Sequence, residues 1–137
     1  MIHKSYLIEE NIDQLKNNIV LFYGENLGLK NDFRDKIKLK FKNTKILRYK
    51  QEEVLKSSDI IINEIRNISL FDDQKILLID QVNDKLLNLI EELTTIDNET
   101  KIFLFADVLE KRSKLRSFFE KSKNCGVVAC YKDNEIS

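Results

Sequence analysis

Two glycines and a lysine follow the first apolar run of the chain, residues 19–23, where an α/β protein binds phosphate. They are Gly24, Gly28 and Lys30. A working phosphate-binding loop has the spacing G-x-x-x-x-G-K-[ST], in which the last hydroxyl binds Mg²⁺. Here the second glycine comes one residue early, the lysine does not follow a glycine, and no hydroxyl residue follows the lysine. We therefore interpret residues 24–31 as a structural turn in which Gly24 adopts an unusual φ angle.

Asp80 has the position of the carboxylate that places Mg²⁺ in ATPases, because it directly follows the apolar run 76–79. The catalytic glutamate expected next is replaced by Gln81. Both halves of an ATP site are therefore present in outline and chemically defective. The sequence predicts a degenerate, non-functional nucleotide loop made by Gly24, Gly28, Lys30 and Asp80.

Other sets of reactive side chains are sparse. His3 is the single histidine, which argues against His-dependent nucleophiles and His-based metal sites. Cys125 and Cys130 are five residues apart along one expected strand, about 16 Å, and a disulfide tolerates a Cα separation of only about 7 Å. We expect buried, reduced thiols, with no catalytic residue, no metal and no cofactor.

A basic stretch covers residues 34–50, and Arg34, Lys38 and Lys42 fall on one face of a predicted helix. One interpretation is a patch that follows phosphate groups of DNA. The other is an ordinary solvated face, which the lysine-rich composition and the net charge of zero favour.

Lys111 and Arg112 precede another predicted helix, where the helix macrodipole disfavours cations. A local conflict of this kind indicates a role outside folding, facing DNA or another subunit.

Two large apolar residues, Leu70 and Phe71, lie between a predicted helix and the run 76–79, directly before two aspartates. We expect this segment to be an exposed loop. Apolar side chains in such a loop either pack into the core or anchor a partner.

The elements that must position these residues are five short apolar runs, at 19–23, 46–49, 76–79, 102–106 and 127–131. Four of them are nearly continuous in apolarity, which is typical of parallel strands that are covered on both faces. The run at 46–49 is more mixed, which is compatible with a place nearer an edge of the sheet. The spacing of 25–30 residues between the runs fits βα units. We therefore predict an α/β fold with a doubly wound, mostly parallel five-stranded sheet.

Apolar stripes at helical spacing fill the segments between the runs, and an additional helix is expected around residues 5–17. The expected N-terminal caps are Asn31 or Asp32, Ser58 or Asp59, Asn83 or Asp84, and Ser113.

The length of 137 residues suits one domain, and 42% hydrophobic residues exclude a disordered chain. No apolar run approaches the length of a membrane span, and the N-terminus lacks a signal-peptide pattern. We expect a soluble, cytoplasmic protein.

Four landmarks together resemble the N-terminal domain of the delta subunit of bacterial DNA polymerase III, a component of the sliding-clamp loader. In chain order they are 21–25 (LFYGE), 69–71 (SLF), 75–79 (KILLI) and 111–115 (KRSKL). The resemblance implies a RecA-like, AAA+-related domain without a working ATP site. It also implies that residues 1–137 are part of a longer subunit, whose lid and collar domains are absent here.

The resemblance further implies that Leu70 and Phe71 insert into a hydrophobic pocket of the clamp and help to open it, with Ile68 and Ser69 as flanking contacts. The expected partners are the sliding clamp and other loader subunits, with DNA contacted indirectly. The alternatives are a small, divergent P-loop-type NTPase or kinase, and direct DNA binding through residues 34–50.

Overall fold

The computed structural model describes residues 1–71, 75–96 and 100–132, with the backbone alone for residues 66–71. Within this part of the chain the strands are Ile2–His3 (β1), Ile19–Tyr23 (β2), Lys45–Lys50 (β3), Lys75–Val82 (β4), Lys101–Ala106 (β5) and Gly126–Ala129 (β6). The α-helices are Ser5–Glu10 (α1), Leu27–Lys40 (α2), Gln51–Lys56 (α3), Ser58–Phe71 (α4), Leu87–Leu93 (α5) and Lys114–Lys121 (α6). Two 3₁₀ helices are Ile12–Gln14 (η1) and Asp84–Leu86 (η2).

The strands form a single sheet in the order β1-β6-β2-β5-β4-β3, and all neighbouring strands are parallel. The predicted α/β class and parallel sheet are confirmed. The expected number of five strands is wrong, because β1 adds a sixth strand beside β6, with Ile2 opposite Val127. A strand of two residues is too short to produce a hydrophobic pattern of its own.

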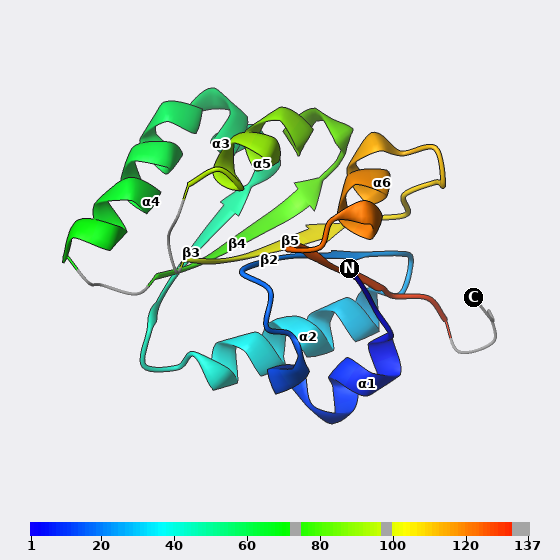
Figure 1. Ribbon diagram of the computed structural model, residues 1–137. Helices are drawn as coiled ribbons and strands as arrows, with labels where there is room; N and C mark the ends of the chain where they lie inside the picture. The colour runs from blue at the N-terminus through cyan, green and yellow to red at the C-terminus, as the bar shows by residue number, and fades with distance from the viewer. Residues whose placement is uncertain (72–74, 97–99, 133–137) are drawn as a thin grey trace.

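Helices cover both faces of the sheet, α1 and α2 on one face and α3 to α6 on the other (Figure 1). The chain moves toward the β3 edge from β1 to β2 and from β2 to β3, and it uses α1 and α2 for these steps. From β3 to β4, β5 and β6 the chain moves in the opposite direction across the sheet, and helices α3 to α6 connect these strands. A change of direction must change the face when crossovers are right-handed, so the topology follows the usual rule.

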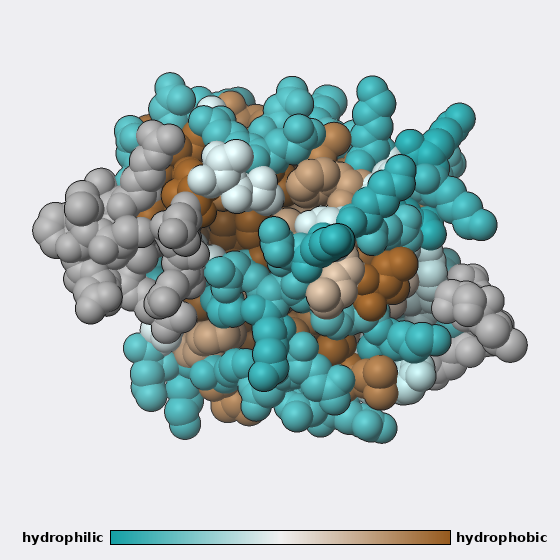
Figure 2. Space-filling model, viewed as in Figure 1, coloured by the Kyte–Doolittle hydropathy of each residue, from teal (hydrophilic) through white to brown (hydrophobic). Residues whose placement is uncertain are grey.

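Two hydrophobic cores result, one on each side of the sheet, and the central strands contribute to both. On the α2 face, Phe22 stacks on Phe105 with a centroid distance of 4.9 Å, and Phe33 of α2 packs 5.0 Å from Phe22. On the other face, the core includes Ile65 of α4, Ile90 of α5 and Phe119 of α6. Hydrophilic side chains form most of the outer surface in the view of Figure 2, where hydrophobic ones show only in separate patches.

The helix boundaries correct several expectations. Helix α2 begins at Leu27 with Asn26 as its cap, since the Asn26 side chain accepts a hydrogen bond from the Leu29 N–H at 3.0 Å. Caps at Asn31 or Asp32 are therefore wrong, because the helix begins before its apolar stripe. The expected helix at 5–17 is also shorter, because α1 ends at Glu10 and η1 follows.

Two other cap predictions are confirmed in the second half of the chain. Ser113 caps α6, with its Oγ accepting from the Arg116 N–H at 3.2 Å. The Asn83 side chain accepts from the Lys85 N–H and caps η2, which leads into α5.

Candidate functional site

The carboxyl edge of the sheet has a point at which the chain changes face. Strands β2 and β5 are neighbours there, but α2 leaves β2 on one face while α6 follows β5 on the other (Figure 1). Such a switch point is where open α/β sheets bind ligands. The turn after β2, which begins with Gly24, lies at this point.

Gly24 begins this turn and requires a glycine for two reasons. Its φ angle is +126°, a conformation that side-chain-bearing residues rarely adopt, which confirms the unusual φ expected for Gly24. A Cβ atom here would lie 2.1 Å from the carbonyl oxygen of Cys130. The turn is held by hydrogen bonds from the Gly24 N–H to the Asp107 carbonyl and from the Asn26 N–H to the Cys130 carbonyl, both 3.1 Å.

Gly28 does not belong to the turn, because it lies in the first turn of α2. A Cβ atom at Gly28 would meet only the Asn26 side chain, at 3.6 Å. The turn between β2 and α2 is therefore only residues 24–26, shorter than the expected 24–31. It is too short to wrap around a phosphate group in the manner of the G-x-x-x-x-G-K loop.

The side chain of Lys30 is buried at the switch point. Its side chain is 4% exposed, and its ammonium group donates to the Ala106 carbonyl at 3.0 Å and to Asp107 Oδ1 at 3.4 Å. A phosphate-binding lysine points outward toward its ligand, whereas this one points at the end of β5. Because Asp107 is exposed, its carboxylate stays hydrated while it balances the buried charge.

Asp80 is also engaged within the protein. Arg34 of α2 donates from Nε and Nη2 to Asp80 Oδ1, at 3.2 and 2.7 Å, and its guanidinium lies 4.1 Å from the centre of the Phe105 ring. Arg34 Nη1 also donates to Asn31 at 2.6 Å. The structure thus brings Gly24, Lys30 and Asp80 to one edge, but neither charged side chain is directed to a ligand.

The expected conflict at the start of α6 is compensated by a residue that sequence reasoning did not assign to that helix. The Asp84 carboxylate accepts from the Ser113 hydroxyl at 2.5 Å and from the N–H groups of Lys114 and Leu115 at 3.2 and 3.3 Å. The Ser113 hydrogen bond, followed by the backbone ones, lowers the pKa of Asp84. An acid at the N-terminus of α6 favours this helix despite the cations before it.

Lys111 and Arg112 themselves lie on the exposed turn before α6. Arg112 forms an exposed ion pair with Glu110 at 2.7 Å.

The thiols are poorly reactive in this fold. Cys125 and Cys130 are free and buried, as expected. Burial raises the pKa of the Cys130 thiol to about 12 and that of Cys125 above its ordinary value. The thiolate is the reactive form of cysteine, so neither residue is a nucleophile at neutral pH.

Ile68, Ser69, Leu70 and Phe71 lie in the last turns of α4, so the expected loop is wrong for their backbone. No glycine or proline occurs between 58 and 71, so nothing in this segment stops the helix. Their side chains lie outside the described residues. Helix α4 runs antiparallel to the strands and ends at the amino edge of the sheet, at the left of Figure 1.

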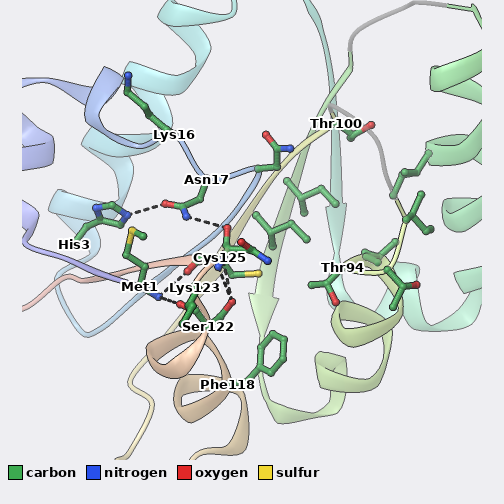
Figure 3. Close-up of a pocket in the computed structure, with 18 of the residues that line it drawn as sticks. Met1, His3, Lys16, Asn17, Thr94, Thr100, Phe118, Ser122, Lys123 and Cys125 are labelled. Carbon is green, nitrogen blue, oxygen red and sulfur yellow. Dashed lines mark hydrogen bonds between the residues drawn. The ribbon is translucent and has the colours of Figure 1, made fainter.

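A pocket of about 890 Å³ opens at this amino edge (Figure 3). It is lined by residues just before β2, β5 and β6 and just after α5 and α6, among them Asn17, Thr94 and Ser122. Ile65 of α4 also lines it, one turn before the predicted clamp-binding residues. No local pattern in the sequence predicts this pocket, because its walls come from segments far apart in the chain.

The N-terminus forms one wall of this pocket. The Met1 ammonium group donates to the carbonyl oxygens of Phe119, Ser122 and Cys125, at 2.7, 2.5 and 2.8 Å. His3 Nε2 lies 2.8 Å from Asn17 Oδ1 (Figure 3). The ammonium group therefore supplies hydrogen bonds to carbonyl groups in the last turn of α6 and in the residues that follow it. The helix macrodipole favours a cation at this end of a helix.

Within residues 1–71, 75–96 and 100–132, no group of three or more His, Cys, Asp and Glu side chains could hold a metal ion. In the same part of the chain, no helix is both long enough and apolar enough to span a bilayer. No protein-family model matches the chain, and no curated protein matches it in sequence.

Proposed function

We propose that this chain is the clamp-binding and clamp-opening module of a replicative clamp loader, acting in DNA replication as part of the DNA polymerase III holoenzyme. Its sheet would be RecA-like and AAA+-related but without ATP hydrolysis of its own. Its partners would be the sliding clamp and the other loader subunits in the cytoplasm, with DNA contacted indirectly.

The observation that carries this proposal is the occupation of the switch point by the protein's own side chains. Lys30 is tied to the end of β5, and Arg34 is tied to Asp80. A domain that keeps the outline of an ATP site and fills it with internal contacts suits a subunit that responds to ATP bound elsewhere. This argues against the alternative, a divergent P-loop-type NTPase or kinase.

The position of α4 also supports the proposal. The helix carries Leu70 and Phe71 to the amino edge, at the opposite end of the strands from the closed switch point. Contacts with a clamp at this edge would leave the carboxyl edge free for neighbouring subunits. The pocket that Ile65 lines opens at this same edge.

Burial of a leucine or phenylalanine side chain contributes about 1.5–3 kcal/mol each. Two such anchors give clamp affinity, but they do not separate a large interface by themselves. Further contacts would therefore come from the second half of α4 and from the amino edge of the sheet.

The test is binding of the protein to the sliding clamp of the same organism, measured by surface plasmon resonance. We expect the double variant Leu70→Ala/Phe71→Ala to weaken binding on the order of 100-fold or more, since each 1.4 kcal/mol is a factor of ten.

Ile60→Ala is the matched control, because Ile60 lies on the same helix and is 65% exposed. It should leave clamp binding unchanged. Equal effects of the control and the double variant, or no effect of the double variant, would overturn the anchor assignment.

A further inference from the structure

Strand β3 is an edge strand of the sheet, and several of its side chains are exposed. Ile46 packs against the core on the α2 face, so Arg48 and Lys50, which alternate with it, point to the same face. Both are exposed, whereas their register neighbours on β4 include the buried Leu78. The α2 face therefore ends in a shelf along β3 that cationic side chains occupy.

Helix α2 supplies the wall of this shelf. Arg34 reaches Asp80, which is the register partner of Lys50, so this side of α2 faces β3. Lys38 lies one turn further along the same side. The opposite side of α2 faces η1, as the 2.6 Å ion pair between Lys40 and Asp13 shows.

The rise per residue of α2 and of β3 places the cations of the helix level with those of the strand. The helix and the strand run antiparallel, and four helical residues rise about 6 Å while two strand residues rise about 7 Å. Arg34 therefore lies level with Lys50, and Lys38 lies level with Arg48. Lys42 follows in the turn that joins α2 to β3.

The shelf has an excess of positive charge that the protein does not neutralise. Asp80 is occupied by Arg34. In the part of the chain that the structure describes, no ion pair involves Lys38, Lys42, Arg48 or Lys50. At the carboxyl end, Glu53 bounds the shelf and accepts a hydrogen bond from the Lys50 N–H.

We infer that Lys38, Lys42, Arg48 and Lys50 form a direct binding surface for the sugar–phosphate backbone of a nucleic acid. Lys45, which begins β3, extends the same edge, and the strand from Lys45 to Lys50 spans about 16 Å. A duplex presents one phosphate per strand for each 3.4 Å of rise, so this length faces about five phosphates. Regularly spaced cations without a pocket suit backbone contacts, which carry no base selectivity.

This inference is independent of the clamp proposal, because it concerns the β3 edge and not the end of α4. Either one can fail while the other holds. It also differs from the expected indirect contact with DNA, because the chain itself would bind the backbone.

The test uses fluorescence anisotropy with a labelled 20-base-pair DNA duplex of arbitrary sequence, and with single-stranded DNA and RNA of the same length. If each of the four cations neutralises one phosphate, duplex affinity should fall about 150-fold between about 50 and 200 mM salt. The triple variant Lys42→Gln/Arg48→Gln/Lys50→Gln should lose about tenfold or more at the lower salt and flatten the salt slope.

The matched control is Lys114→Gln/Lys121→Gln/Lys123→Gln, because it removes the same charge from exposed lysines at α6, on the other face of the sheet. It should change affinity less than twofold. Absence of binding to all three oligonucleotides at low salt, or equal loss in the two triple variants, would overturn the inference. So would equal displacement of the duplex by polyglutamate, which would indicate an acidic protein partner.

Discussion

Lys30 shows how one side chain decides what a site can do. Its position in the sequence resembles that of a phosphate-binding lysine. In the structure its side chain is almost completely buried and donates a hydrogen bond to the Ala106 carbonyl. Its tie to β5, 76 residues away, is invisible in a spacing of glycines and a lysine. The spacing of the loop residues predicts a defective phosphate site, but it does not predict that the lysine of the loop binds the end of β5.

The two glycines of the degenerate loop should respond oppositely to the same substitution. Gly24→Ala should destabilise the fold by about 1–3 kcal/mol, because alanine at a positive φ is strained and its Cβ would meet the Cys130 carbonyl. Gly28→Ala should stabilise it by about 0.5–1 kcal/mol, because that site is helical and open. Urea denaturation of both variants checks this, and a similar midpoint shift in the two would contradict it.

At the scale of elements, helix α6 depends on a carboxylate from another segment. Asp84, in η2, accepts hydrogen bonds from Ser113 and from two N–H groups at the start of α6. Because the folded-state pKa of Asp84 is lowered from 3.8, its stabilising effect is present above that pH and is lost as the pH falls through the folded value.

Asp84→Asn should therefore be less stable than the wild type at pH 7, by about 1 kcal/mol, as for loss of a helix cap. The difference should shrink as the pH is lowered below about 4, because the wild-type carboxyl then becomes protonated as well. Thermal unfolding of both proteins across pH 3 to 7 measures it. A difference that stays constant with pH would show that the charge of Asp84 plays no part.

Most elements were predictable because their signals are local. The four nearly continuous apolar runs each became a central strand, and the Ser113 cap was readable from its position before an apolar stripe. The errors have physical causes too. β1 is stabilised by β6 rather than by its own two residues, and α4 continues to Phe71 because no residue before it breaks a helix.

At the scale of the whole molecule, the doubly wound topology places different segments of the chain at the two edges of the sheet. Helices that follow strands must run back toward the amino edge, so α4 delivers residues 68–71 there, while the turn after β2 stays at the carboxyl edge. The contacts that define both edges join distant parts of the chain. Arg34 and Asp80 are separated by 46 positions in the sequence, and Met1 and Phe119 by 118 positions. No periodicity in the sequence reports contacts of that separation.

The closed carboxyl edge predicts the outcome of a nucleotide titration. Isothermal calorimetry with Mg-ATP should give no saturable binding, because Lys30 and Arg34 already occupy the switch point through internal contacts. A P-loop NTPase titrated in the same buffer serves as the positive control. Saturable binding with micromolar affinity would overturn both our description of this edge and the non-catalytic assignment.

The pairing of the first strand with the last one constrains how this protein is made. Ile2 and His3 of β1 pair with Val127 and Val128 of β6, so all the intervening residues must be translated before β1 can pair. Strand β2 also has no pairing partner until later strands are synthesised, since its neighbours in the sheet are β5 and β6. The nascent chain therefore carries apolar strands without their partners until β5 and β6 have emerged, so folding of this sheet is dominated by distant contacts and depends on protection from aggregation.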